Sequence, residues 1–165
     1  AKPADVPTYV EYGAADLGVV GKDILLESRK DVAELLDLGF GCCRLIVAVL
    51  KSSGIKDLQD LDFNSRVATK FPRITTEFFS RQGIQAEVVH LNGSVELGPI
   101  VGLADAIVDI TETGTTLVEN GLIPIADIAR VTSRLIANRV SYKVKYHTIE
   151  GLVRRLREVL AKDAD

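Results

Sequence analysis

Short apolar runs alternate with helix-like segments between residues 65 and 121, and this alternation limits the possible folds more than any other feature of the sequence. Strands that alternate with helices indicate α/β units with largely parallel strands. The predicted strands cover residues 66–71, 86–91 and 104–110, and the predicted helices cover 73–83, 94–103 and 115–121. Gly83 and Gly121 are suited to end the first and last of these helices.

The flanking regions predict a second set of elements. They comprise helices from Pro7 to about Ala15 and at 22–28, 55–61 and 148–162, and strands at 16–21 and 43–50, while 31–38 fits either a helix or a strand. Thr148 is the expected N-cap of the last helix, whose arginine-rich face we expect to be solvated. Two strand-like runs within 123–142 would let the chain leave one lobe and return to it. We therefore expect one lobe of residues 1–48 and 137–165, and a second lobe of residues 49–136.

Composition excludes several classes of protein. With 47% hydrophobic residues and a net charge of -3, the 165-residue chain is neither disordered nor a strongly basic nucleic-acid binder. Its longest apolar run, 45–50, is far shorter than the ~20 residues of a membrane span. The adjacent Cys42 and Cys43 form neither a metal-binding spacing nor a disulfide framework, and we expect them to be small packed residues. We therefore predict a cytoplasmic protein without nucleic-acid or membrane partners.

The segment after the third predicted strand is the first candidate site. Ligands of parallel α/β sheets bind at the carboxyl ends of strands, and here Asp109 precedes a threonine-rich turn that opens a helix. Gly114 would allow a close backbone approach, while Thr113, Thr115 and Thr116 supply hydroxyls beside free N–H groups, which suits a phosphate. Asp109 could accept hydrogen bonds from ribose hydroxyls. The alternative is an ordinary threonine-capped helix start with a turn glycine.

Three other strand ends carry polar residues. Lys70 follows one predicted strand and could meet a phosphate, although a solvated lysine is the alternative. Glu96 follows the turn at 92–94, and Gly21, Lys22 and Asp23 form a glycine turn at a helix start. The sequence contains no Walker loop, no GxGxxG motif, no metal-ligand cluster and no nucleophile–base motif. We expect no protein metal site, and we expect His90 to be a structural residue of a core strand.

Several long segments together resemble one known family, the catalytic chain of ATP phosphoribosyltransferase, the first enzyme of histidine biosynthesis. The resemblance covers about residues 3–143 and is carried by segments 5–23, 34–48, 66–72, 91–122 and 134–143. It implies a two-lobed α/β fold like that of type II periplasmic binding proteins, with a ligand cleft between the lobes. It also implies that ATP and phosphoribosyl pyrophosphate meet there, with Mg²⁺ carried on the pyrophosphate.

The resemblance also implies residue roles. Thr113, Gly114, Thr115 and Thr116 would hold the 5-phosphate of phosphoribosyl pyrophosphate, with Lys70 and Glu96 as further substrate-binding candidates. Asp109 and Glu112 would lie near the ribose as the catalytic candidates. Gly21, Lys22 and Asp23 would face the nucleotide.

Two departures from the family pattern affect the expected assembly. The family's opening strand and helix have no counterpart here, and the chain ends one helix after the segment 134–143. It thus resembles the short form, which works with a regulatory subunit similar to a histidyl-tRNA synthetase. We therefore expect homo- and hetero-oligomers, and no inhibition by histidine of this chain alone.

A solute-binding module of the same fold, without catalysis, is the main alternative function. A third interpretation is a non-catalytic subunit or a degraded paralogue, which the intact threonine-rich turn disfavours. The phosphoribosyl transfer that the resemblance implies requires no strong protein nucleophile, because adenine N1 attacks the anomeric carbon as pyrophosphate leaves. Positioning and charge stabilisation would then supply the catalysis.

Overall fold

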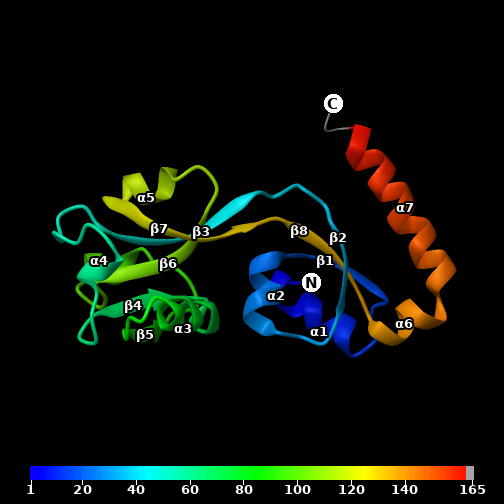
Figure 1. Cartoon of the computed structure of the whole chain (residues 1–165), viewed down its shortest axis with the longest axis horizontal. Coiled ribbons are helices and arrows are strands. Elements are labelled where there is room, and N and C mark those ends of the chain that lie inside the picture. The colour runs from blue at the N-terminus through cyan, green and yellow to red at the C-terminus, as the bar shows by residue number, and fades with distance from the viewer. Residues whose placement is uncertain (163–165) are drawn as a thin grey trace. The chain divides into compact units, whose positions relative to one another are not determined.

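Residues 1–162 are described by a computed structural model, and they form two compact units (Figure 1). The first unit contains Ala1–Cys42 and the chain from Val131 onward, and the second contains Cys43–Arg130. The expected two-lobed α/β fold is therefore confirmed. The expected lobe boundaries, after residues 48 and 136, lie a few residues further along the chain than these divisions. No helix within residues 1–162 has the length and apolar character needed to cross a membrane.

The first unit is built on a three-stranded sheet in the order β1-β8-β2. Its strands are β1 (Leu17–Gly21), β2 (Ala33–Asp37) and β8 (Ser133–Ala137). Its helices are η1 (Pro3–Asp5), α1 (Val6–Glu11), α2 (Lys22–Ser28), α6 (Arg139–Val144) and α7 (Tyr146–Lys162). The returning strand β8 lies between the other two and is antiparallel to both.

Helix α1 packs closely on this sheet because Gly18 lacks a side chain. A Cβ at Gly18 would lie 2.8 Å from a methyl of Val6 and 2.9 Å from a methyl of Val10, which is closer than atoms can approach. Val10 is fully buried, in a cluster with Val20 and Ile136. The contact fixes α1 against β1 and β8.

The C-terminal helices differ from the prediction in two ways. Helix α7 begins at Tyr146, so Thr148 lies within it and the predicted N-cap is wrong. Helix α6 was not predicted; the side chain of Asn138 caps it by accepting hydrogen bonds from the N–H groups of Val140 and Ser141, both at 2.9 Å. Only Lys145 separates α6 from α7, so residue 148 has helical backbone and not the extended backbone of an N-cap.

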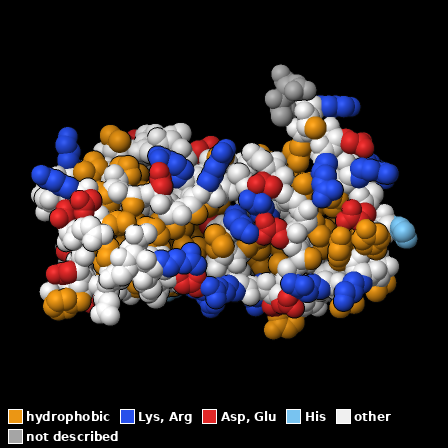
Figure 2. Space-filling view, viewed as in Figure 1, with side chains coloured by type: hydrophobic (Ala, Val, Ile, Leu, Met, Phe, Trp, Pro, Cys, Tyr) orange, Lys and Arg blue, Asp and Glu red, His pale blue; other side chains and the backbone are white. Residues whose placement is uncertain are grey.

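Helix α7 buries an apolar stripe and exposes basic residues. Ile149 and Val153 pack with Leu38 and Leu135 in one core cluster of the first unit. Outside this stripe the helix carries the exposed arginines Arg154, Arg155 and Arg157, and Figure 2 shows Lys and Arg side chains in blue over α7. The expected solvated arginine face is confirmed.

The second unit is built on a five-stranded sheet in the order β5-β4-β6-β3-β7. Its strands are β3 (Cys43–Leu50), β4 (Arg66–Thr69), β5 (Glu87–His90), β6 (Ala106–Thr111) and β7 (Leu122–Val131). Its helices are η2 (Leu58–Asp60), α3 (Pro72–Arg81), α4 (Leu97–Ile100) and α5 (Thr115–Glu119).

Strand directions correct the prediction of a largely parallel sheet. Strand β4 is parallel to both β5 and β6, as the alternation predicts for strands joined by helices. Strand β3, however, is antiparallel to β6, and the whole sheet of the first unit is antiparallel. The reason is that β3 and β8 are not part of the strand–helix alternation.

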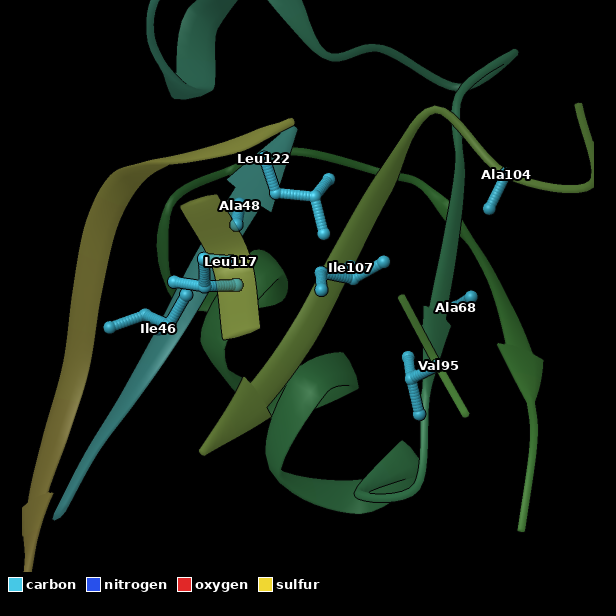
Figure 3. Packing of buried hydrophobic residues seen from close by; sticks show 8 residues of the cluster. All are labelled: Ile46, Ala48, Ala68, Val95, Ala104, Ile107, Leu117 and Leu122. Atoms are coloured by element: carbon cyan, nitrogen blue, oxygen red, sulfur yellow. The ribbon is translucent and has the colours of Figure 1, made fainter. Parts of the chain in front are cut away.

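A buried cluster connects α5 to the sheet beneath it. Leu117 of α5 is 7% exposed and packs with Ile46 and Ile107, as Figure 3 shows together with the rest of the cluster. Burying such a leucine side chain contributes roughly 1.5–3 kcal/mol. This packing holds the start of α5, and the turn before it, at the end of β6.

Two residues are more exposed than predicted. His90 ends the edge strand β5 and is exposed, so the prediction of a core histidine is wrong. Cys42 is also exposed, whereas its neighbour Cys43 is half-buried. The prediction of two packed cysteines is therefore wrong for Cys42.

Candidate active site

The turn between β6 and α5 has a conformation that requires glycine. Gly114 has φ +81°, in the left-handed region, and no atom lies within 4 Å of the place where a Cβ would stand. Its N–H donates to Thr111 Oγ1 at 2.9 Å, and the hydroxyls of Thr113 and Thr115 are hydrogen-bonded at 2.8 Å. The threonine side chains therefore hold the turn in shape on both sides of Gly114.

This turn borders a pocket of about 320 Å³ at the end of β6. Six of the residues predicted from the sequence line it, namely Glu96, Asp109, Glu112, Thr113, Thr115 and Thr116. Ile107, Ile110, Thr111 and Leu117 complete the lining. Among the described residues, the backbone N–H groups of Thr113 and Thr116 donate no hydrogen bond, so they remain available to a ligand.

Asp109 is held in place by two contacts. Its Oδ1 accepts a hydrogen bond from the N–H of Ile110 at 2.8 Å and lies 3.0 Å from Lys70 Nζ. The side chains of Lys70 and Asp109 are 34% and 22% exposed, so the ion pair is only partly screened by solvent. Lys70, expected either to meet a phosphate or to be solvated, therefore lies beside the pocket as the partner of Asp109.

The charges around the pocket define what it can bind. Three carboxylates line it, Glu96, Asp109 and Glu112, and only Asp109 has a lysine beside it in the described structure. A phosphate dianion is repelled by carboxylates, so its binding there depends on the threonine hydroxyls and the free N–H groups. The unpaired carboxylate oxygens suit hydroxyl donors or a hard cation.

The other predicted residues lie in the first unit, at the junction of β1 and α2. Lys22 donates a hydrogen bond to Glu34 Oε2 and is 28% exposed. A Cβ at Gly21 would stand 2.2 Å from Oδ1 of the buried Asp23, so any other residue there would require this carboxylate to move. None of these three residues is among those that line the pocket at the end of β6.

Sequence reasoning missed two threonines, one that lines the pocket and one next to Lys70. Thr111 receives the N–H of Gly114 and lines the pocket. Thr69, fully buried at the end of β4, donates to the carbonyl oxygen of Val108 at 2.8 Å. Both threonines are visible in the sequence, Thr69 before Lys70 and Thr111 before Glu112. That the Thr69 hydroxyl contacts the backbone of β6, however, depends on the pairing of β4 with β6.

Comparison with known proteins identifies what the chain is similar to. The sequence model of the HisG family, described as ATP phosphoribosyltransferase, matches residues 2–158. The ATP phosphoribosyltransferase of Halothermothrix orenii is 55% identical over 97% of this chain and 72% of its own length. That of Desulfitobacterium hafniense is 54% identical over 98% of this chain and 75% of its own.

Solved structures give the same result. A chain of the ATP phosphoribosyl transferase (HisG:HisZ) complex from Thermotoga maritima is 36% identical, with a TM-score of 0.84 over 98% of this chain and 78% of that one. The alkanesulfonate-binding protein SsuA from Xanthomonas axonopodis pv. citri is 13% identical, with a TM-score of 0.62 over 98% of this chain and 62% of that one. The second likeness shows a shared fold alone.

Proposed function

This chain belongs to the ATP phosphoribosyltransferase family, and we propose that it joins ATP to phosphoribosyl pyrophosphate in the first step of histidine biosynthesis. The products are N1-(5-phosphoribosyl)-ATP and pyrophosphate. The observation that carries this proposal at the level of residues is the threonine-lined pocket at the end of β6. We place the reaction in the cytoplasm, where ATP is made.

The turn at Gly114 is the proposed site of the 5-phosphate. Thr113, Thr115 and Thr116 line the pocket with hydroxyls, and the free N–H groups of Thr113 and Thr116 add backbone donors. Such neutral donors bind a dianion without needing a lysine or arginine. Gly114 keeps a side chain out of the turn and gives it the left-handed backbone that it requires.

Asp109 and Glu112 are proposed to contact the ribose. Ionised carboxylates only accept hydrogen bonds, and ribose hydroxyls donate them. The ion pair with Lys70 holds the Asp109 carboxylate in one position. The ammonium group of Lys70 also lies beside the pocket, where it would attract the negatively charged leaving pyrophosphate.

Magnesium is proposed to enter as part of the substrate, bound to the pyrophosphate. The carboxylate of Glu96, in the same pocket, is an oxygen donor of the type that Mg²⁺ prefers. When bound, the cation neutralises charge on the leaving pyrophosphate. It also reduces the repulsion between that group and the carboxylates of the pocket.

Catalysis then depends on positioning. Adenine N1 attacks the anomeric carbon while the bond to pyrophosphate breaks, and positive charge develops on the ribose. Asp109 and Glu112 are the groups of this chain that would stabilise that charge, and the turn at Gly114 would hold the ribose by its phosphate. We further propose that Gly21, Lys22 and Asp23 bind the nucleotide, on the strength of the family resemblance of that turn.

A regulatory partner forms the second part of the proposal. We propose that this chain forms homo-oligomers and assembles with a regulatory subunit similar to a histidyl-tRNA synthetase. The support is its likeness to the chain solved as part of a HisG:HisZ complex. Light scattering during gel filtration of the mixed proteins should show one larger species, inhibited by histidine. Separate elution of the two proteins would contradict the proposal.

Labelled ATP decides between the enzyme and a binding module. The protein is incubated with labelled ATP, phosphoribosyl pyrophosphate and Mg²⁺, and the products are separated by chromatography. We expect one pyrophosphate for each phosphoribosyl-ATP formed, and no product when phosphoribosyl pyrophosphate is omitted. Binding of both substrates without turnover would instead indicate a solute-binding module.

A further inference from the structure

A buried hydroxyl joins the two chain segments that carry Lys70 and Asp109. Thr69 is 0% exposed, and its Oγ1 makes three hydrogen bonds. It donates to the carbonyl oxygen of Val108 at 2.8 Å, and it accepts from the N–H of Phe71 at 2.9 Å. It also accepts from Thr75 Oγ1 at 3.3 Å.

The first two of these bonds flank the ion pair of the site. Phe71 directly follows Lys70, and Val108 directly precedes Asp109. Thr69 and Val108 are paired residues of the parallel strands β4 and β6. One hydroxyl therefore fixes the turn that carries Lys70 to the strand that carries Asp109, and the resulting Nζ to Oδ1 distance is 3.0 Å.

We propose that Thr69 is a positioning residue, whose hydroxyl sets the geometry of the Lys70–Asp109 pair for binding phosphoribosyl pyrophosphate. This inference rests on the proposed function, because it assigns Thr69 a role at the same pocket. Thr69 itself is fully buried and is not one of the residues that line the pocket. It acts through the two backbones that it joins.

Valine in place of Thr69 removes the hydroxyl and keeps the shape. The N–H of Phe71 then loses its acceptor in a buried place, which favours movement of the turn before α3. Such movement carries Lys70 with it. Because displacements of about 1 Å can cost up to 100-fold in an active site, we expect the Michaelis constant for phosphoribosyl pyrophosphate to rise about tenfold in Thr69→Val.

Two further variants separate positioning from stability. Thr69→Ser keeps the hydroxyl and should leave this Michaelis constant within about twofold of the wild type. Thr75→Val is the matched control, since Thr75 is also a fully buried threonine and its hydroxyl bonds Thr69 but neither the N–H of Phe71 nor the carbonyl of Val108. It should lower the melting temperature without changing that Michaelis constant.

The experiment measures kcat and both Michaelis constants for the three variants, with melting temperatures. The inference predicts that only Thr69→Val raises the constant for phosphoribosyl pyrophosphate, while the constant for ATP stays within about twofold. A Thr69→Val protein that melts earlier but keeps the wild-type constant would show a purely structural role and overturn the inference.

Two other outcomes are distinguishable. If Thr69→Val does not fold, Thr69→Ala is compared with Thr69→Ser, because both lack the methyl group and differ only in the hydroxyl; equal constants in this pair would refute positioning. If the wild-type protein forms no product at all, the proposed function fails, and this inference fails with it.

Discussion

Replacing Gly114 by alanine is expected to weaken the binding of phosphoribosyl pyrophosphate by a predictable amount. Gly114 has φ +81°, and an alanine in the left-handed region is disfavoured by about 1–2 kcal/mol. A methyl group would meet no atom within 4 Å, so the cost comes from the backbone rather than from a clash. The free mutant turn can relax toward negative φ, and binding must restore the original shape.

The magnitude follows from that strain. If binding has to restore a conformation that costs about 1–2 kcal/mol, the dissociation constant rises roughly 5- to 30-fold. Gly121→Ala provides a matched control at the other end of α5. Gly121 has φ +66° and also has no atom within 4 Å of a Cβ position, and it does not line the pocket.

Isothermal titration with phosphoribosyl pyrophosphate and Mg²⁺, with urea unfolding of both variants, tests this prediction. Both variants should be destabilised by similar amounts, and only Gly114→Ala should bind more weakly. Wild-type affinity in Gly114→Ala would show that the turn does not hold the phosphate. Equal weakening in both variants would show a general loss of stability instead.

Three further perturbations have defined outcomes. Asp109→Asn should lower kcat/KM at least tenfold, equivalent to about 1.4 kcal/mol, and a loss below about twofold would place Asp109 outside the reaction. Asn138→Ala should lower the free energy of unfolding in urea by about 2–3 kcal/mol, because Asn138 caps α6 and also donates hydrogen bonds to two backbone carbonyls of α1. An unchanged free energy of unfolding would contradict this. The N–H of Asp31, and then Lys30, hold the pKa of Glu11 below its ordinary value of 4.5. The lowered pKa stabilises the fold above pH 4.5, and this contribution is lost as the pH falls through the pKa of the folded state. The free energy of unfolding of the wild type should therefore fall more steeply below pH 4.5 than that of Glu11→Gln. Equal slopes for the two proteins would refute this prediction.

The sequence predicted elements well where a local pattern determines them. The aliphatic run of β3 and the helix α2 were both predicted with the bounds that the structure shows. Whether neighbouring strands are parallel or antiparallel was predicted poorly, because the apolar pattern of a strand is the same in both arrangements. The antiparallel position of β8 between β1 and β2 depends on where the returning chain finds unpaired strands, and no local pattern encodes that.

The pocket at the end of β6 was predicted in part. The sequence indicated the threonine-rich turn and Asp109 because polar residues directly follow an apolar strand, and these residues line one pocket; their roles stay predictions. The ion pair of Lys70 with Asp109 could not be found, because it requires knowing that β4 and β6 are neighbours in a given register. The hydroxyl of Thr69 was missed for the same reason.

A crystal structure with bound phosphoribosyl pyrophosphate and Mg²⁺ tests whether the turn at Gly114 holds the substrate. We expect the 5-phosphate within hydrogen-bond distance of the hydroxyls and N–H groups at Thr113, Thr115 and Thr116, with the ribose hydroxyls on Asp109. Density for the 5-phosphate at any other place, with the turn at Gly114 empty, would contradict it.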